Sequence, residues 1–135
     1  MSKPIPQVQK YMTPSPITIG VEQSIAHARD VMREHHIRHL PVLHGGHIVG
    51  LLSERDVALV ETLAGVDPKT VTVEDAMTQE PYTTAPDTTI DRVAAEMAEH
   101  KYGAAIVLSN QKVVGVFTTV DACRTLAELF DGRLK

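Results

Sequence analysis

The sequence predicts an α/β (α+β) fold in which two tandem β-α-β-β-α repeats pack sheet to sheet about a pseudo-twofold axis. The first observation behind this prediction is an internal duplication: sliding the chain by 65 residues pairs 8–57 with 73–122, and 14 of the 50 pairs are identical. The second is that each copy contains one helical apolar spacing followed by two short apolar runs. The third is size, because one copy of about 50 to 60 residues would leave a sheet face uncovered.

The duplication divides the 135 residues into five segments. We expect a flexible, proline-rich N-terminus (1–7), a first repeat (8–63), a turn-rich linker (64–72), a second repeat (73–130) and a C-terminal tail (131–135). The two repeats together form one module.

Each repeat opens in the same way. A short turn of helix at 8–11 or 73–76 leads through Met-Thr and a proline into an extended piece at 17–19 or 82–84. A helix follows, with its apolar residues spaced by three, four and seven as one buried face requires. These residues are Ile25, Ala28 and Met32 in the first copy, and Ile90, Val93, Ala94 and Met97 in the second.

Two apolar runs come next in each copy and predict strands covered on both faces. In the first copy they span 39–43 and 47–52, joined by Gly45-Gly46, a pair that suits the positive φ angles of a tight hairpin. In the second copy they span 104–108 and 112–117, joined by Asn110-Gln111. A second helix then runs to about Leu63 or Phe130.

Composition argues against several classes of partner. A net charge of −4, a pI near 5.9 and only 4% aromatic residues argue against nucleic acid and anionic membranes as partners. No apolar run approaches the roughly 18 residues of a membrane-spanning helix, and the N-terminus has no signal-peptide core, so we expect a cytoplasmic protein. The single cysteine, Cys123, cannot form an internal disulfide.

The most informative motif is Gly50-x-x-Ser53-x-x-Asp56, which recurs 65 residues later as Gly115-x-x-Thr118-x-x-Asp121. A glycine within a strand allows a ligand or another backbone to come close. A hydroxyl residue at a strand-to-helix junction lies beside free backbone N–H groups, which bind phosphate readily. A carboxylate one turn later suits the hydroxyls of a ribose. The repeated motif therefore indicates two sites for a sugar phosphate.

A second interpretation of the same motif needs no ligand. Ser53-x-x-Asp56 and Thr118-x-x-Asp121 are also capping boxes, in which the hydroxyl and the acid satisfy only N–H groups of their own helix. This interpretation explains the hydroxyl and the acid but not the glycine.

The chain resembles a pair of cystathionine-β-synthase (CBS) domains, also called a Bateman module, of the stand-alone kind. The resemblance covers nearly the whole chain, from about Val8 to Leu126. It rests on the Met-Thr-x-x-Pro openings at Met12 and Met77, on the stretch Ile-Arg-His-Leu-Pro-Val at 37–42, and on the two Gly-x-x-[Ser/Thr]-x-x-Asp ends. Each feature is weak alone, and together they are specific.

The resemblance implies a regulatory module, not an enzyme, that binds AMP, ADP, ATP or S-adenosylmethionine in clefts between the repeats and signals by a change of conformation. It also implies a homodimer and an unidentified protein that the module regulates. The hydroxyl and the acid of each motif would contact phosphate and ribose. The full expected set is Thr18, Ile37, Arg38, His39, Pro41, Gly50, Ser53, Arg55, Asp56, Tyr102, Gly103, Gly115, Thr118 and Asp121.

The two copies differ in charge at this expected site. The first has Arg55 inside the motif and Arg38-His39 before the first long strand, where the second has Val120 and Gly103-Ala104. We therefore expect the first site to bind phosphate more strongly, since Arg55 can donate charge-assisted hydrogen bonds unless it is only a solvated helix charge. Arg38 could also serve the second site across the pseudo-twofold.

Three other functions compete with nucleotide sensing. Five histidines between 35 and 47 lack a repeated ligand spacing, so we expect no metal, although His39 could make affinity depend on pH. The motifs supply no nucleophile with a base and an orienting acid, which argues against an enzyme. A ligand-independent module for dimerisation or protein interaction remains the alternative.

Overall fold

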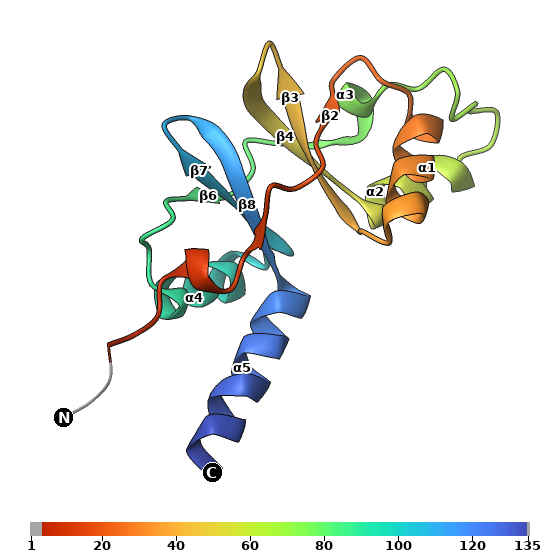
Figure 1. Cartoon of the computed structure of the whole chain (residues 1–135). Helices are drawn as coiled ribbons and strands as arrows, with labels where there is room; N and C mark the ends of the chain where they lie inside the picture. The colour runs from red at the N-terminus through yellow and green to blue at the C-terminus, as the bar shows by residue number, and fades with distance from the viewer. Residues whose placement is uncertain (1–3, 135) are drawn as a thin grey trace. The chain divides into compact units, whose positions relative to one another are not determined.

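The computed structural model describes residues 4–134 (Figure 1). The chain forms two compact units. The first-repeat unit is Ile17–Pro81, and the second-repeat unit consists of the described parts of Met1–Pro16 and Tyr82–Lys135. Both units combine one mixed sheet with helices, which confirms the predicted α/β class with two repeats. The packing of one sheet on the other stays a prediction.

The first-repeat unit contains a four-stranded sheet in the order β2-β3-β4-β5. Strands β2 and β3 are parallel, and the other neighbours are antiparallel. Its elements are β2 (Ile19–Gly20), α1 (Ile25–His35), β3 (His39–His44), β4 (His47–Ser53), α2 (Glu54–Thr62), α3 (Val73–Ala76) and β5 (Thr78–Gln79).

The second-repeat unit repeats this arrangement with the order β1-β8-β7-β6. Its elements are the 3-10 turn η1 (Val8–Lys10), β1 (Thr13–Pro14), β6 (Thr83–Thr84), α4 (Ile90–His100), β7 (Ala104–Ser109), β8 (Lys112–Thr118) and α5 (Thr119–Leu134). No helix in residues 4–134 is long and apolar enough to cross a membrane.

The opening segment of each repeat folds with the other repeat. Thr13 of β1 pairs with Val116 of β8, and Thr78 of β5 pairs with Leu51 of β4. The fully buried Val8 belongs to the core that contains Phe117, whereas Val73 belongs to the core of the first repeat. The compact units therefore differ from the sequence repeats by an exchange of their opening segments.

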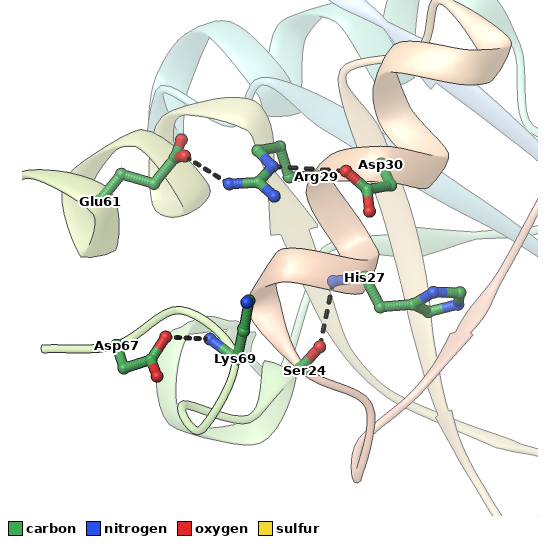
Figure 2. Close-up of polar contacts among 7 residues, drawn as sticks. All are labelled: Ser24, His27, Arg29, Asp30, Glu61, Asp67 and Lys69. Atoms are coloured by element: carbon green, nitrogen blue, oxygen red, sulfur yellow. Dashed lines mark hydrogen bonds and ion pairs between the residues drawn. The ribbon is translucent and has the colours of Figure 1, made fainter.

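Helix α1 shows how the sequence dictates these elements. Its buried residues Ile25, Ala28 and Met32 are the predicted apolar face. Ser24 caps its N-terminus by accepting a hydrogen bond from the backbone N–H of His27 at 3.0 Å (Figure 2). His36 ends it in the left-handed conformation, with φ 54°. The same pattern produces α4, whose buried residues are Ile90, Val93 and Met97.

Both hairpins use left-handed turn residues, as predicted for Gly45 and Gly46, which have φ angles of 59° and 81°. Asn110 and Gln111 have φ angles of 52° and 65°, so the second hairpin adopts the same kind of turn without glycine. The strands end within a residue or two of the predicted bounds.

The terminal segments have regular structure or contacts within the described residues. Helix α5 continues beyond Phe130 to Leu134, so the expected tail is helical over its described residues. In the expected flexible N-terminus, the carbonyl of Pro6 accepts a hydrogen bond from the N–H of Ile90 at 2.9 Å. Residues 1–3 and 135 of these two segments lie outside the described residues.

Candidate functional site

The end of each β hairpin brings the expected site residues together. His39 lies directly opposite Ser53 in the β3-β4 pair, and the N–H of Glu54 donates to the carbonyl of Arg38 at 2.8 Å. In the second-repeat unit Ala104 lies opposite Thr118, and the N–H of Thr119 donates to the carbonyl of Gly103 at 3.1 Å. The segment before the first long strand therefore adjoins the helix N-terminus in both units, as the site hypothesis requires.

The first motif forms a complete capping box at the N-terminus of α2. The Ser53 Oγ accepts a hydrogen bond from the N–H of Asp56 at 3.1 Å, and the Asp56 Oδ2 accepts one from the N–H of Ser53 at 2.9 Å. The Asp56 side chain is half-buried, and its Oδ1 takes no part in the box.

The second motif has the same geometry at the N-terminus of α5. The Asp121 Oδ2 accepts hydrogen bonds from the Thr118 N–H at 2.8 Å and the Thr118 Oγ1 at 3.0 Å, and the Asp121 N–H approaches Oγ1 at 3.3 Å. Asp121 is only 7% exposed. Capping is therefore confirmed as the local role of the hydroxyl and the acid in both copies. In both boxes the backbone N–H of the hydroxyl residue donates to Oδ2 of the acid. Capping therefore leaves Oδ1 of each acid for further contacts.

The two motifs differ less in their surrounding charge than the sequence indicates, because other charged side chains lie close to each of them. The Arg38 Nε lies 3.8 Å from the Glu54 Oε2, which partly offsets its charge, and both side chains are well exposed. The second motif also has a cation beside it, because the Arg124 Nη1 lies 3.5 Å from the Asp121 Oδ1. The expected difference in phosphate affinity between the two sites stays a prediction. Arg55 is exposed and forms no ion pair within the described residues.

The two motif glycines make room for methionines. A Cβ added to Gly50 would collide with the sulfur of Met77 and lie 2.9 Å from the carbonyl oxygen of Thr78. A Cβ added to Gly115 would collide with the sulfur of Met12. The close approach that a strand glycine indicates is thus made by the exchanged opening segment: by a methionine at both glycines, and at Gly50 also by the backbone of Thr78. A role of these glycines in ligand binding stays a prediction.

The remaining expected residues lie in different environments. Thr18 is half-buried just before β2, and Ile37 is half-buried at the end of α1, where its N–H donates to the carbonyl of Met32 at 3.0 Å. Pro41 is fully buried within β3, so its ring belongs to the core of the unit. Tyr102, which is 37% exposed, is the second-repeat counterpart of Ile37.

Tyr102 belongs to a stack of three rings that the sequence analysis missed. Its ring centroid lies 5.1 Å from that of Tyr82 and 5.1 Å from that of His100, with interplanar angles of 14° and 23°. Burial raises the pKa of Tyr82, partly countered by a hydrogen bond with Thr84. The signal was present, because the repeat places Tyr82 and Tyr102 where the first copy has Ile17 and Ile37.

No group of three or more His, Cys, Asp or Glu side chains in the described part of the chain converges as a metal site. Both motifs have helix N–H groups, a hydroxyl, a carboxylate oxygen outside the capping box and a nearby arginine, although in the second motif that oxygen, Asp121 Oδ1, already lies 3.5 Å from the Arg124 Nη1. Such a set has donors and acceptors that suit a sugar phosphate, and it contains no group that would by itself identify the attached base.

Comparisons with known proteins point to one family. The model of the CBS domain family matches this chain twice, over residues 8–61 and 73–128. Inosine-5′-monophosphate dehydrogenase of Korarchaeum cryptofilum is 32% identical over 122 residues, which make up 90% of this chain and 24% of that enzyme. The chain thus spans about a quarter of that relative.

Two solved structures are similar to this chain over most of its length. The CBS domain pair of protein MJ0100, in complex with 5′-methylthioadenosine and S-adenosyl-L-methionine, has a TM-score of 0.81 and 29% identity, covering 96% of this chain and 99% of that one. The hexameric CBS-CP12 protein from bloom-forming cyanobacteria has a TM-score of 0.77 and 28% identity, covering 88% of this chain and 67% of that one.

Proposed function

Because this chain belongs to the CBS domain family, we propose that it is a regulatory module whose two repeats bind an adenosine-containing ligand: AMP, ADP, ATP or S-adenosylmethionine. Binding shifts the conformation that a regulated protein partner senses. The proposal carries over no dehydrogenase activity, since the chain covers only 24% of the dehydrogenase relative. The ligands named for the MJ0100 domain pair, both adenosine compounds, support this ligand class.

One observation carries the proposal: each capping box engages the Oδ2 of its acid and leaves Oδ1 outside the box. A carboxylate can therefore hold the helix N-terminus with one oxygen and accept hydrogen bonds from ribose hydroxyls with the other. In the first turn of each helix, the N–H groups of Arg55 and Val120 take no part in these hydrogen bonds and lie beside the acid for a phosphate. The N–H groups of Glu54 and Thr119 already donate to the carbonyls of Arg38 and Gly103. Capping and ligand binding are thus compatible roles of the same residues.

The test separates these two roles of Asp56. Asp56→Asn keeps an oxygen that can accept from the Ser53 N–H, but it replaces the second acceptor with an NH₂ donor. We expect the free energy of unfolding to change little and the affinity for AMP or ATP to fall by about 1 to 3 kcal/mol, measured by isothermal titration calorimetry. Mass spectrometry of the denatured protein would identify a co-purified ligand.

Asp75→Asn is the matched control. Thr72 and Asp75 form a further Thr-x-x-Asp box at α3, outside the glycine-containing motif, with the Thr72 Oγ1 3.0 Å from the Asp75 Oδ2. This substitution should leave the affinity unchanged. Equal affinity of wild type and Asp56→Asn for every adenosine ligand would show that the motif only caps the helix and binds no ligand.

A second role, assembly of copies of the chain, is favoured by exposed apolar side chains on the second helix of each repeat. On α2 and just after it these are Leu59 and Leu63, and on α5 they are Val120, Leu126, Leu129 and Phe130. Side chains of this kind mark contact surfaces when they gather on one face. We infer a homodimer built from α1, α2, α4 and α5, which sedimentation velocity at micromolar concentration tests directly.

A further inference from the structure

The two Gly-x-x-[Ser/Thr]-x-x-Asp motifs share a backbone geometry but differ in which side-chain groups are already engaged. In the first motif the Asp56 Oδ2 accepts one hydrogen bond, from the Ser53 N–H at 2.9 Å. In the second motif the Asp121 Oδ2 accepts two, from the Thr118 N–H at 2.8 Å and from the Thr118 hydroxyl at 3.0 Å. The Thr118 hydroxyl therefore gives its only proton to the acid of its own motif.

An arginine adds to this difference. The Arg124 Nη1 lies 3.5 Å from the Asp121 Oδ1, the oxygen that the capping box leaves out. The first repeat has Leu59 at the corresponding position, and no ion pair within residues 4–134 involves Asp56. The carboxylate oxygen outside the capping box is thus open in the first motif and paired with a cation in the second.

The two partners of this ion pair differ in their exposure to water. Asp121 is 7% exposed, whereas the side chain of Arg124 is 72% exposed. A carboxylate that is largely removed from water gains more from a nearby cation than an exposed carboxylate does. The exposed guanidinium remains partly screened by solvent and free to turn toward another acceptor. Arg124 can therefore pair with Asp121 in the ligand-free protein and move to a stronger acceptor when one binds.

The duplication shows that the fold does not require an arginine at this position. Both capping boxes form, although only the second repeat has the arginine. Leu59 is 61% exposed, so its position on α2 also faces water. Arg124 can accordingly be replaced by leucine without removing a group that the helix needs.

We propose that Arg124 and Thr118 make the second site selective for ligands that carry a phosphate. The proposal rests on the nucleotide-binding function proposed above and assigns a specificity to one of its two sites. A phosphate has several acceptor oxygens and can take over both donors, the guanidinium of Arg124 and the hydroxyl of Thr118. The Asp121 Oδ1 is then released to accept hydrogen bonds from ribose hydroxyls.

A ligand without an anionic group cannot make this exchange. The ribose of adenosine has to compete with Arg124 for the Asp121 Oδ1, and adenosine has no anionic group to pair with the displaced guanidinium. AMP supplies that partner with its phosphate. Removing the arginine should therefore affect the two ligands in opposite directions: adenosine should gain affinity for the second site, and AMP should lose affinity.

A site-resolved titration tests this expectation in the full chain. Amide NMR signals of residues 118–121 report the second motif, and those of residues 53–56 report the first. Adenosine and AMP are titrated separately into wild type and into Arg124→Leu, which introduces the residue of the first repeat. At the second motif the Kd for adenosine should fall about threefold and the Kd for AMP should rise about threefold. Both values should stay unchanged at the first motif.

Arg124→Lys is the charge-retaining control. A lysine keeps a cation three residues after Asp121, so the ratio of the AMP affinity to the adenosine affinity should stay close to that of wild type. Urea denaturation of both variants measures the free energy of unfolding, which should change little because the side chain of Arg124 is exposed. A changed ligand ratio at unchanged stability separates specificity from loss of structure.

The converse substitution tests the same rule in the first repeat. Leu59→Arg places a guanidinium three residues after Asp56, which is the spacing of Arg124 from Asp121. It should raise the Kd for adenosine at residues 53–56 about threefold. Leu59→Gln changes the same exposed leucine without adding a charge and should leave that Kd unchanged. The difference between these variants isolates the charge from any effect of Leu59 on assembly.

Failure of this proposal is distinguishable from failure of the proposed function. If AMP, ATP, adenosine and S-adenosylmethionine all leave the signals of both motifs unchanged, the nucleotide-binding function is overturned and the selectivity with it. If the ligands bind at the motifs but Arg124→Leu moves the second-site Kd for adenosine and for AMP in the same direction, or moves neither, only the selectivity is overturned. The ion pair of Arg124 with Asp121 would then be a surface contact without influence on the ligand.

Discussion

At the scale of single residues, each motif glycine packs closely against one methionine. Gly50 lies under Met77 and Gly115 under Met12, and both methionines come from exchanged opening segments. The glycines and the Met-Thr openings are therefore two halves of one packing feature, although they lie far apart in the sequence.

A substitution at Gly115 tests this packing. Gly115→Ala should lower the free energy of unfolding by about 1 to 3 kcal/mol, because the new methyl group collides with the Met12 side chain. Combining it with Met12→Ala should cost less than the sum of the two single changes, since the shortened side chain leaves space for the methyl. Urea denaturation measures all three variants. Strictly additive effects would show that the two residues do not share a packing site.

Residue-scale predictions from the sequence succeeded where the repeat supplied a second example. The two capping boxes and the adjacency of His39 to Ser53 follow from local spacing and from strand pairing. The ion pairs of Arg38 and Arg124 did not follow, because they depend on how exposed side chains turn on a helix. Predicting the contacts of Met12 and Met77 with the glycines requires knowing which repeat each opening segment packs against.

At the scale of elements, the two hairpins reach the same turn by different means. Gly45-Gly46 and Asn110-Gln111 both adopt positive φ angles, but glycine does so without steric cost and glutamine does not.

The apolar runs and the helix periodicity were sufficient to predict the long strands and the helices. The two-residue strands β1 and β5 were missed, because their pairing partners are distant and no alternation of polarity fits in so short a span.

An exchange of turn residues between the hairpins checks this interpretation. Gln111→Gly should raise the free energy of unfolding by about 1 kcal/mol, since it removes a left-handed glutamine. The reverse change, Gly46→Gln, should lower it by a similar amount. Thermal unfolding followed by circular dichroism would compare the two variants. A loss of stability in both would contradict the assignment of the cost to the φ angle.

At the scale of the whole molecule, the exchange of opening segments is the feature that the sequence could not reveal. The repeat shows that η1 and α3 are equivalent, but either could pack with either repeat without changing the pattern of apolar residues. Only the three-dimensional pairing of β1 with β8 and of β5 with β4 decides between these arrangements.

Matched core substitutions in the opening segments test the exchange. Val8→Ala and Val73→Ala each remove a fully buried side chain and should each cost about 2 kcal/mol. Their local effects should differ, because Val8 packs with the second repeat and Val73 with the first. Hydrogen exchange should accelerate in β7 and β8 for Val8→Ala, and in β3 and β4 for Val73→Ala. The opposite assignment would contradict the exchange.

The same exchange fixes the order in which the two units can be completed during synthesis on the ribosome. The first-repeat unit has all its strands once residue 81 has emerged. The second-repeat unit uses one of the earliest strands, β1, together with β8, which ends at Thr118. In the meantime β1 has an unpaired edge and Val8 has no core to enter. The second repeat of a neighbouring chain can accept that segment in the same register, so domain swapping is the misassembly to expect from crowded nascent chains.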